Sequence, residues 1–298
     1  MIFMTGSTGF VGRALLRRLI EKNETVRCLA RNSGRRGLLK HPRLTWIEGD
    51  LLHPERFRTG MGEADTVIHL VGVLVPAGEG TFDRIHRQGT EAMVKMARDA
   101  GARRYLQMSA LGTRPDARSR YHQTKWAAEE AVRGSGLAYT IFRPSVIFGA
   151  EDRFTNLFSR MIDLSPVLPL IGGGKNRLQP IWVEDVVDYF VQALERGETA
   201  GKTYELGGPR VYSMEGLIDL LMKIKGKRRL KFSLPIGAAR LQAALMESIL
   251  PKPPLTRDQL LMLEEDNVVG DPAAAKDFSV KLASMEEILP GYLKSPAG

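Results

Sequence analysis

A tyrosine and a lysine, Tyr121 and Lys125, stand four residues apart in a segment whose pattern predicts a helix over residues 119–133. Residues at this spacing share one helix face. A tyrosine hydroxyl has an ordinary pKa of about 10, and a neighbouring ammonium group lowers that pKa by favouring the phenolate. Ser109, at the end of the preceding predicted strand, is placed to hydrogen-bond a substrate oxygen, and Thr113 is an alternative for that role. The arrangement indicates proton transfer at a carbonyl or an alcohol.

A glycine-rich turn near the first residue is typical of a dinucleotide-binding site. It lies between a predicted strand over residues 2–5 and a predicted helix over residues 11–22. Gly6 permits a tight turn, Gly9 lets backbone N–H groups approach a pyrophosphate, and Gly12 lets the helix pack closely on the strand. The first N–H groups of the helix then face the phosphates. The cofactor-binding residues predicted here are Gly6, Ser7, Thr8, Gly9, Phe10, Val11 and Gly12.

The end of the second predicted strand indicates which dinucleotide binds. An acidic residue there, about twenty residues past the glycines, would bond the ribose 2′-hydroxyl of NAD. This chain has Ala30, Arg31 and Asn32 instead, followed by Arg35 and Arg36. A guanidinium holds a 2′-phosphate through two hydrogen bonds, and no carboxylate at this place repels it. We therefore predict NADPH or NADP as the cofactor, with Arg31 as a binding residue, in preference to NAD.

The first half of the chain alternates predicted strands and helices with short connections. Its strands are apolar and β-branched, as expected for a sheet that is covered on both faces. The alternation predicts an α/β fold, a Rossmann-type doubly wound parallel sheet. Strands are predicted over residues 2–5, 25–31, 44–49, 66–72, 104–110 and 138–143, and helices over residues 11–22, 81–100 and 119–133.

The pattern changes after residue 149. Prolines and the run Gly172–Gly174 predict loops around a short helix. A strand over residues 179–183 and a helix over residues 184–194 are expected to return to the main sheet, and two or three further helices follow. We expect a Rossmann domain over residues 1–150 with 176–196, and a smaller, mixed but mainly helical lobe over residues 151–175 with 197–298.

Several short motifs occur together along about the first 195 residues. They are the turn at residues 5–12, Gly49-Asp50-Leu51, His69-Leu70-Val71-Gly72, Ser109, Tyr121-His122-Gln123-Thr124-Lys125 and Arg143-Pro144-Ser145-Val146-Ile147-Phe148-Gly149. Together they resemble the short-chain dehydrogenase/reductase superfamily in its extended and atypical, NAD-dependent epimerase/dehydratase-like branches. The resemblance implies that Asp50 and Leu51 hold the adenine, that Leu70, Val71 and Gly72 pass beside the ribose, that the backbone of Pro144, Ser145 and Ile147 meets the nicotinamide amide, and that Tyr121, Lys125 and Ser109 form the catalytic group.

Three further stretches point to a subgroup. They are Phe148–Phe154, Gln179–Val186 and Pro254–Gln259. They are similar to the group that contains the NADPH-binding accessory subunit of respiratory complex I and its bacterial relatives. In that group the cofactor is often regarded as structural, so the resemblance supports NADPH binding more than turnover. His86 departs from the wider pattern, since extended members often carry an asparagine there.

The overall charge and the cysteine count limit the partners. The net charge is +9, but no zinc-finger, RRM or helix-turn-helix signature accompanies it, so we expect no nucleic-acid partner. The five histidines and the single cysteine, Cys28, show no metal-ligand spacing, so no metal is expected. One unpaired cysteine and the lack of a membrane-spanning apolar run favour a cytoplasmic location.

A cluster of Lys and Arg at residues 223–231 precedes an apolar helix predicted over residues 236–250. Such a patch is suited to peripheral docking on the inner membrane or on a protein complex, and the alternative is a solvated loop before a core helix. Two functions remain open. One is an NADPH-dependent oxidoreductase or epimerase-like enzyme for a carbonyl or alcohol substrate that no motif identifies; the other is a non-catalytic NADPH-binding accessory or redox-sensing subunit of a respiratory-type complex.

Overall fold

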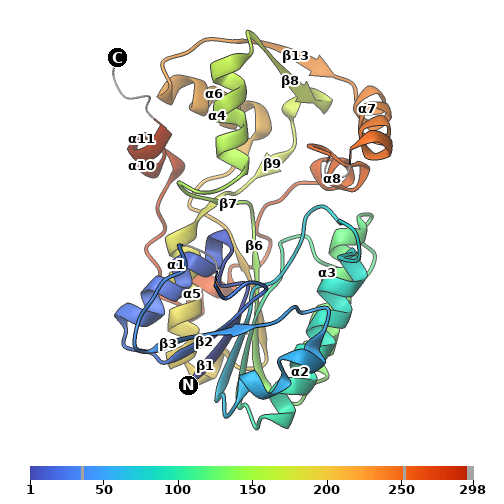
Figure 1. Ribbon diagram of the computed structural model, residues 1–298. Helices are drawn as coiled ribbons and strands as arrows, with labels where there is room; N and C mark the ends of the chain where they lie inside the picture. Colours follow the sequence, from blue (N-terminus) through green and yellow to red (C-terminus); the bar gives the residue numbers. More distant parts are fainter. Residues whose placement is uncertain (35–36, 251–252, 294–298) are drawn as a thin grey trace.

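The main sheet of the computed structural model has seven strands, all parallel (Figure 1). The structure describes residues 1–34, 37–250 and 253–293. The strands are β1 (Ile2–Thr5), β2 (Val26–Ala30), β3 (Leu44–Glu48), β4 (Thr66–His69), β5 (Arg104–Met108), β6 (Ala138–Pro144) and β11 (Lys202–Leu206), in the spatial order β3-β2-β1-β4-β5-β6-β11. The order reverses between β1 and β4, so the crevice for a ligand lies at their carboxyl ends. The predicted doubly wound fold is confirmed.

Helices cover both faces of this sheet (Figure 1). On one face, α1 (Phe10–Glu21) packs against α5 (Val183–Glu195) over a core that includes Leu15 and Phe190. On the other face lie α2 (Gly89–Asp99) and α3 (Arg120–Arg133). The single helix predicted over residues 81–100 is divided, because a π-helical segment, η3 (Asp83–Gln88), precedes α2.

The strand predicted over residues 179–183 does not join the main sheet. Only Ile181–Trp182 form a strand, β10, and it pairs with β7 (Ile147–Phe148) beyond the end of β6. The seventh strand is β11, which lies in the segment expected to belong to the smaller lobe. The reason is the connection. After β6 the chain passes through β7, the smaller lobe and β10, and then α5 covers one face of the sheet, so that the next strand returns beside β6 in parallel.

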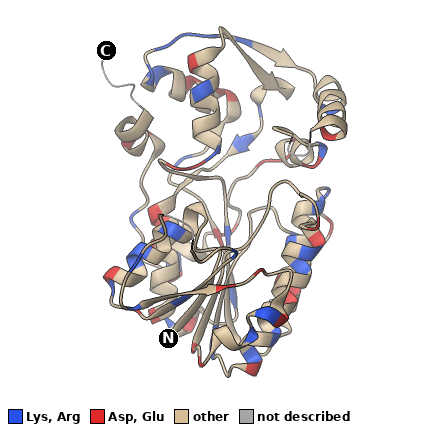
Figure 2. Ribbon diagram, viewed as in Figure 1, with Lys and Arg blue, Asp and Glu red and all other residues tan. Residues whose placement is uncertain are grey.

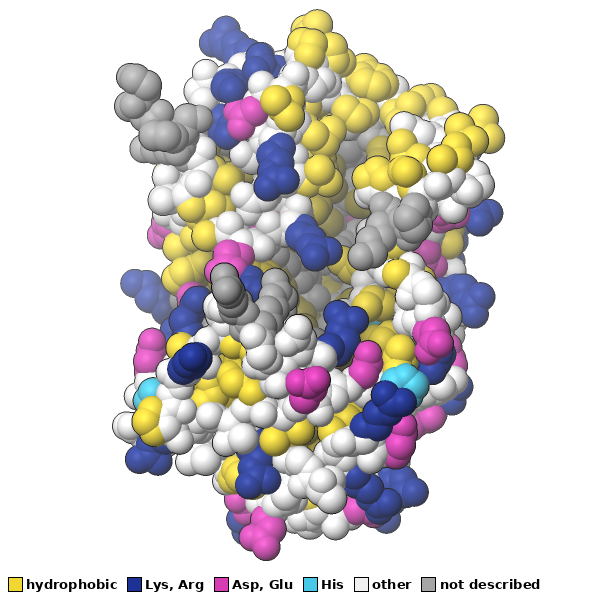
Figure 3. All heavy atoms as spheres, in the orientation of Figure 1, with side chains coloured by type: hydrophobic (Ala, Val, Ile, Leu, Met, Phe, Trp, Pro, Cys, Tyr) yellow, Lys and Arg dark blue, Asp and Glu magenta, His cyan; other side chains and the backbone are white. Residues whose placement is uncertain are grey.

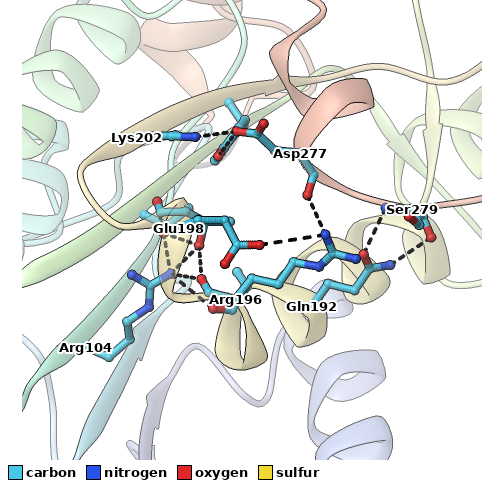
Figure 4. Close-up of polar contacts among 11 residues, drawn as sticks. Arg104, Gln192, Arg196, Glu198, Lys202, Asp277 and Ser279 are labelled. Carbon is cyan, nitrogen blue, oxygen red and sulfur yellow. Dashed lines mark hydrogen bonds and ion pairs between the residues drawn. The ribbon is translucent and has the colours of Figure 1, made fainter.

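A late segment of the chain also packs under the main sheet, beside β11 (Figure 4). The Lys202 ammonium lies 2.7 Å from a carboxylate oxygen of Asp277. The Gln192 side chain donates to the carbonyl oxygen of Ser279 and accepts from its N–H, each at 3.0 Å. Phe278 is buried among the aromatic rings of this core. Residues around 277–279 are therefore fastened to the Rossmann domain and not to the smaller lobe.

The smaller lobe is mainly helical, as expected, and has its own apolar core. Its strands are β8 (Val167–Ile171), β9 (Arg177–Leu178), β12 (Tyr212–Ser213) and β13 (Leu230–Leu234), and its helices are α4 (Phe154–Leu164), α6 (Met214–Ile224), α7 (Ile236–Ile249), α8 (Arg257–Leu263), α10 (Met285–Ile288) and α11 (Pro290–Leu293), with α9 (Ala273–Asp277) returning to β11. Within the described residues, none of the helices has the length and hydropathy needed to cross a membrane.

Candidate functional site

The glycine-rich turn forms a tight cradle at the carboxyl end of β1. Gly6 has a φ of +78°, and the Gly9 N–H donates to the Gly6 carbonyl oxygen at 2.9 Å. A Cβ on Gly12 would overlap that same oxygen and lie 2.7 Å from Cα of Ser7. A Cβ on Gly6 would lie 3.0 Å from the backbone of Leu70. Side chains are therefore excluded at the places where a pyrophosphate needs close approach.

The start of α1 is left open to an anion. The helix begins at Phe10, its N-cap residue Gly9 offers no side-chain acceptor, and its first turn has no acidic residue. Its first N–H groups therefore point to the crevice together with the positive end of the helix dipole. The Phe10 ring packs against Gly149, where a Cβ would lie 3.0 Å from it. The cradle and the helix start both fit a dinucleotide.

Arg31 directly follows β2 and is exposed beside the crevice. The nearest carboxylate by register is Glu48, because Ala30 is paired with it across β2 and β3. That carboxylate accepts a hydrogen bond from the Ser33 hydroxyl at 2.6 Å. The Arg31 guanidinium makes no ion pair within the residues that the structure describes. Arg35 and Arg36, which strengthened the prediction of NADPH, lie outside the described residues.

The residues expected beside the adenine and the ribose end the neighbouring strands. Asp50 forms a turn after β3, with its side chain accepting from the Leu52 N–H at 3.0 Å, and Leu51 is buried. Leu70 follows β4 and is buried, while Val71 and Gly72 continue toward the crevice. These segments and the cradle lie along one edge of the sheet.

Lys125 is buried between β5 and the chain after β4. Its ammonium group donates to the Met108 carbonyl oxygen at 3.1 Å, and a Cβ on Gly72 would lie 3.0 Å from its Nζ. Burial lowers the pKa of Lys125 to about 8. Burial also raises the pKa of the Tyr121 hydroxyl, and no opposing effect of Lys125 is found. The lowering of the tyrosine pKa expected from the sequence is therefore not seen, and the Lys125 ammonium is hydrogen-bonded to the Met108 carbonyl oxygen.

Ser109 and Thr113, the two alternatives for the substrate-binding hydroxyl, lie together. Both are buried, and their hydroxyl oxygens are 3.5 Å apart. The Ser109 N–H donates to the Phe142 carbonyl oxygen at 2.7 Å, which fixes its backbone beside the end of β6. The two hydroxyl groups between which the sequence did not decide are therefore neighbours at the same edge of the sheet.

His86 joins the chain after β4 to helix α3. Its Nε2 accepts from the Val73 N–H at 3.0 Å, so the hydrogen is on Nδ1, which lies 2.9 Å from the Thr124 hydroxyl. Its ring meets the Tyr121 ring edge-on, with 5.2 Å between centroids. Burial lowers the pKa of His86 to about 2, so the imidazole is neutral. It is a structural support for the tyrosine.

Two polar residues of the late chain reach this site, and no spacing in the sequence predicted them. The Asp258 carboxylate accepts from the backbone N–H of Tyr121 at 3.2 Å. The Asn267 side chain accepts from the Ser145 hydroxyl at 2.6 Å and donates to the Leu111 carbonyl oxygen at 3.3 Å. Asp258 belongs to Pro254–Gln259, one of the stretches that pointed to a subgroup. The resemblance therefore drew attention to this segment but predicted no role for Asp258.

The backbone of Pro144 and Ser145, which is expected at the nicotinamide end, is hydrogen-bonded to chain segments on both sides. The Pro144 carbonyl oxygen accepts from the Leu111 N–H at 2.9 Å, and the Ser145 N–H donates to the Leu206 carbonyl oxygen at 2.8 Å. Ile147 begins β7 and pairs with Ile181. In the part of the chain that is described, no group of three His, Cys, Asp or Glu residues is placed to hold a metal ion.

Comparison with known proteins gives related chains of two kinds. Over 303 residues the chain is 32% identical to "NADH dehydrogenase [ubiquinone] 1 alpha subcomplex subunit 9, mitochondrial" of Arabidopsis thaliana, covering 97% of this chain and 74% of the relative. Over 269 residues it is 28% identical to a 4-hydroxy-2-methyl-3-oxo-4-farnesyl-3,4-dihydroquinoline-1-oxide ketoreductase of Stigmatella aurantiaca, covering 83% and 80%. One relative is named as a subunit and the other as an enzyme.

The fold and a family model agree with these relatives. The structure of DesIV, a dTDP-glucose 4,6-dehydratase from Streptomyces venezuelae with NAD and TYD bound, matches with a TM-score of 0.78 at 19% identity, covering 98% of this chain and 95% of that one. This likeness concerns the fold. The model for the NAD dependent epimerase/dehydratase family matches residues 2–207. The chain belongs to this family of nicotinamide-dinucleotide proteins, as its short-chain dehydrogenase/reductase motifs indicated.

Proposed function

We propose that this protein binds NADPH in the crevice between β1 and β4. The pyrophosphate lies on the cradle at Gly6–Gly12, and Arg31 holds the 2′-phosphate at the end of β2. The exposed guanidinium and the lack of an acidic residue directly after β2 support this choice over NAD. Asp50 and Leu51 flank the adenine, and Leu70–Gly72 flank the ribose.

We further propose that the protein is an oxidoreductase or epimerase-like enzyme for a carbonyl or alcohol substrate. The observation that carries this proposal is the position of Lys125: its ammonium group lies beside Gly72 and Met108, one helical turn after Tyr121 and at the crevice edge. When bound, the reduced nicotinamide supplies a hydride to the carbonyl carbon. The Tyr121 hydroxyl then gives its proton to the carbonyl oxygen, which Ser109 or Thr113 holds by a hydrogen bond.

Lys125 has two tasks in this scheme. Its ammonium binds the ribose hydroxyls next to the nicotinamide, exchanging the Met108 carbonyl for them. Its positive charge also favours the phenolate that remains on Tyr121 after proton transfer. Burial of both side chains strengthens this electrostatic effect because little water screens it.

A second function is favoured by one observation, the similarity to the Arabidopsis subunit along 97% of the chain. In that case NADPH is held as a structural or redox-sensing ligand, and the smaller lobe docks on a protein complex at the inner face of the cytoplasmic membrane. The raised pKa of the buried Tyr121 hydroxyl agrees with such a site, since this group holds its proton firmly.

The experiment that tests the enzyme is a comparison of the wild-type protein with Tyr121→Phe. NADPH binding is followed by cofactor fluorescence, and turnover by NADPH oxidation with a panel of ketones and aldehydes. We expect unchanged binding and a loss of turnover of about 100-fold or more. Equal turnover in both proteins would overturn the role of Tyr121 as the proton donor. No turnover in either protein, with tight NADPH binding in both, would overturn the enzyme and leave the subunit. Absence of NADPH binding to the wild type would overturn both.

A further inference from the structure

Helix α7 carries its largest apolar side chains on the outside. Its two fully buried residues are the alanines Ala239 and Ala243. Leu241, Leu245 and Ile249 stand four residues apart and therefore share a face, and they are 75%, 60% and 68% exposed. A helix that serves only the core of a lobe has the opposite arrangement, with leucine inside and small or polar residues outside.

The outer surface of α7 continues onto neighbouring elements. On β13, Leu230 and Phe232 are exposed, and Leu164 at the end of α4 is 86% exposed. The Leu230 N–H donates to the carbonyl oxygen of Pro166, two residues past Leu164, so these elements are adjacent. Figure 3 shows hydrophobic side chains along the top and upper right of the smaller lobe, over β13 and α7. We call Leu164, Leu230, Phe232, Leu241, Leu245 and Ile249 the apolar face.

A basic hollow adjoins the apolar face in the chain immediately before β13. It has a volume of about 620 Å³, and its cations are Lys223, Lys227, Arg228 and Arg229. Its one carboxylate, Asp219, is ion-paired with Lys231 at 2.9 Å. Lys227 is paired with Asp163, at 2.6 Å. Among the described residues, the other three cations have no carboxylate within ion-pairing distance. Figure 2 shows this loop as a run of Lys and Arg between α6 and β13. The hollow therefore keeps a net positive charge.

We propose that the apolar face and the basic hollow together dock on the surface of an anionic phospholipid membrane. Aliphatic side chains that enter the interface and Lys or Arg side chains that meet phosphate groups are the two signals that peripheral attachment requires. The hollow is large enough to hold a headgroup phosphate between several cations. A second copy of this chain fits less well, because a symmetric contact would bring two basic hollows together.

This proposal does not depend on NADPH binding or turnover, since no residue of the apolar face or hollow belongs to the candidate site. It is tested by co-sedimentation of the full chain with vesicles of phosphatidylcholine alone and of phosphatidylcholine with phosphatidylglycerol. Binding is expected only to the anionic vesicles, and it weakens as salt is added. Each basic residue near such a surface strengthens binding roughly fivefold, so Lys223→Glu with Arg228→Glu should weaken binding roughly 25-fold or more.

The apolar contribution is tested by Leu241→Ser with Leu245→Ser, for which we expect binding roughly tenfold or more weaker. Matched controls lie on the Rossmann domain. Lys95→Glu with Arg98→Glu changes the net charge equally on α2, and Leu39→Ser removes another exposed leucine. Both controls should bind like the wild type.

Three results would overturn the proposal. The first is equal binding, or none, of the wild type to the two kinds of vesicle. The second is wild-type binding by both altered pairs while circular dichroism shows them folded. The third is a dimer in analytical ultracentrifugation that Leu241→Ser with Leu245→Ser disrupts, since the apolar face would then be an interface between copies of the chain.

Discussion

The carboxylate of Asp258, in the smaller lobe, accepts a hydrogen bond from the backbone N–H of Tyr121 at 3.2 Å, across 137 residues of sequence. It also accepts from the Arg120 N–H at 2.6 Å, while the Ser119 hydroxyl accepts from the His122 N–H at 3.2 Å. The first turn of α3 is therefore capped from two sides, once by its own N-cap residue and once by the other lobe. The position of Tyr121 depends on how the smaller lobe is seated.

Asp258→Ala is expected to lower the free energy of unfolding by about 1 to 2 kcal/mol, because two N–H groups of α3 lose their acceptor and the negative charge at the helix start is lost. Urea unfolding followed by circular dichroism measures this. Asp258→Asn keeps an acceptor oxygen and should lose less. The control is Asp116→Ala, which removes an exposed carboxylate before the same helix. An equal effect at Asp116 would show that the cap contributes nothing specific.

Arg31→Asp is expected to weaken NADPH binding about tenfold to a hundredfold, because a charged hydrogen-bonding partner of the 2′-phosphate is replaced by a repelling carboxylate. NADH binding should stay the same or strengthen, since an acid at this place can bond the ribose 2′-hydroxyl. Fluorescence titration with both cofactors measures the change in preference. Arg17→Asp, exposed on α1, makes the same charge change elsewhere. An unaltered NADPH affinity in Arg31→Asp would refute the assignment of the cofactor.

The strands of the main sheet could be predicted from the sequence where a short run of mostly apolar residues is buried on both faces. Ile2–Thr5 and the centre of Arg104–Met108 are of this kind. The edge strand Lys202–Leu206 could not be predicted in the same way, because its run is only five residues long, is largely polar and stands among loops. Its place is decided by the parallel pairing with β6, a tertiary contact that no local pattern encodes.

The site could be predicted only in part for a similar reason. Gly6 and Gly12 could be predicted from their spacing in the sequence, since the turn brings them together within one βα unit. Asp258 and Asn267 act over more than a hundred residues of sequence separation, so no local spacing relates them to Tyr121 or Ser145.

Gly12→Ala is expected to destabilise the protein by about 1 to 3 kcal/mol and to weaken NADPH binding, although alanine favours a helix. The added Cβ would overlap the Gly6 carbonyl oxygen, which is rigid backbone, so the cradle must open. The matched control is Gly237→Ala in the first turn of α7, where a Cβ meets nothing within 4 Å. That change should be neutral or slightly stabilising. Thermal unfolding and NADPH titration of both variants check the pair, and a stable, fully binding Gly12→Ala would contradict this account of the turn.

Lys125→Met is expected to make the cofactor-free protein more stable near pH 7 while weakening NADPH binding. The pKa of Lys125 falls from 10.5 to about 8 in the fold, so below pH 8 the native state carries a buried charge that is unfavourable relative to the unfolded chain. Removing that charge should stabilise by about 1 to 2 kcal/mol, after the lost hydrogen bond to Met108 is allowed for.

The sign of the pH dependence distinguishes this effect from simple repacking. Between pH 8 and 10.5 the unfolded chain binds the lysine proton and the native state does not, so wild-type stability from this group rises with pH. The advantage of Lys125→Met should therefore be constant below pH 8 and shrink above it, as measured by urea unfolding at several pH values. Lys95→Met, on the exposed side of α2, should show no such trend. A variant that gains stability and loses cofactor affinity would mark Lys125 as a residue kept for binding at the expense of the fold.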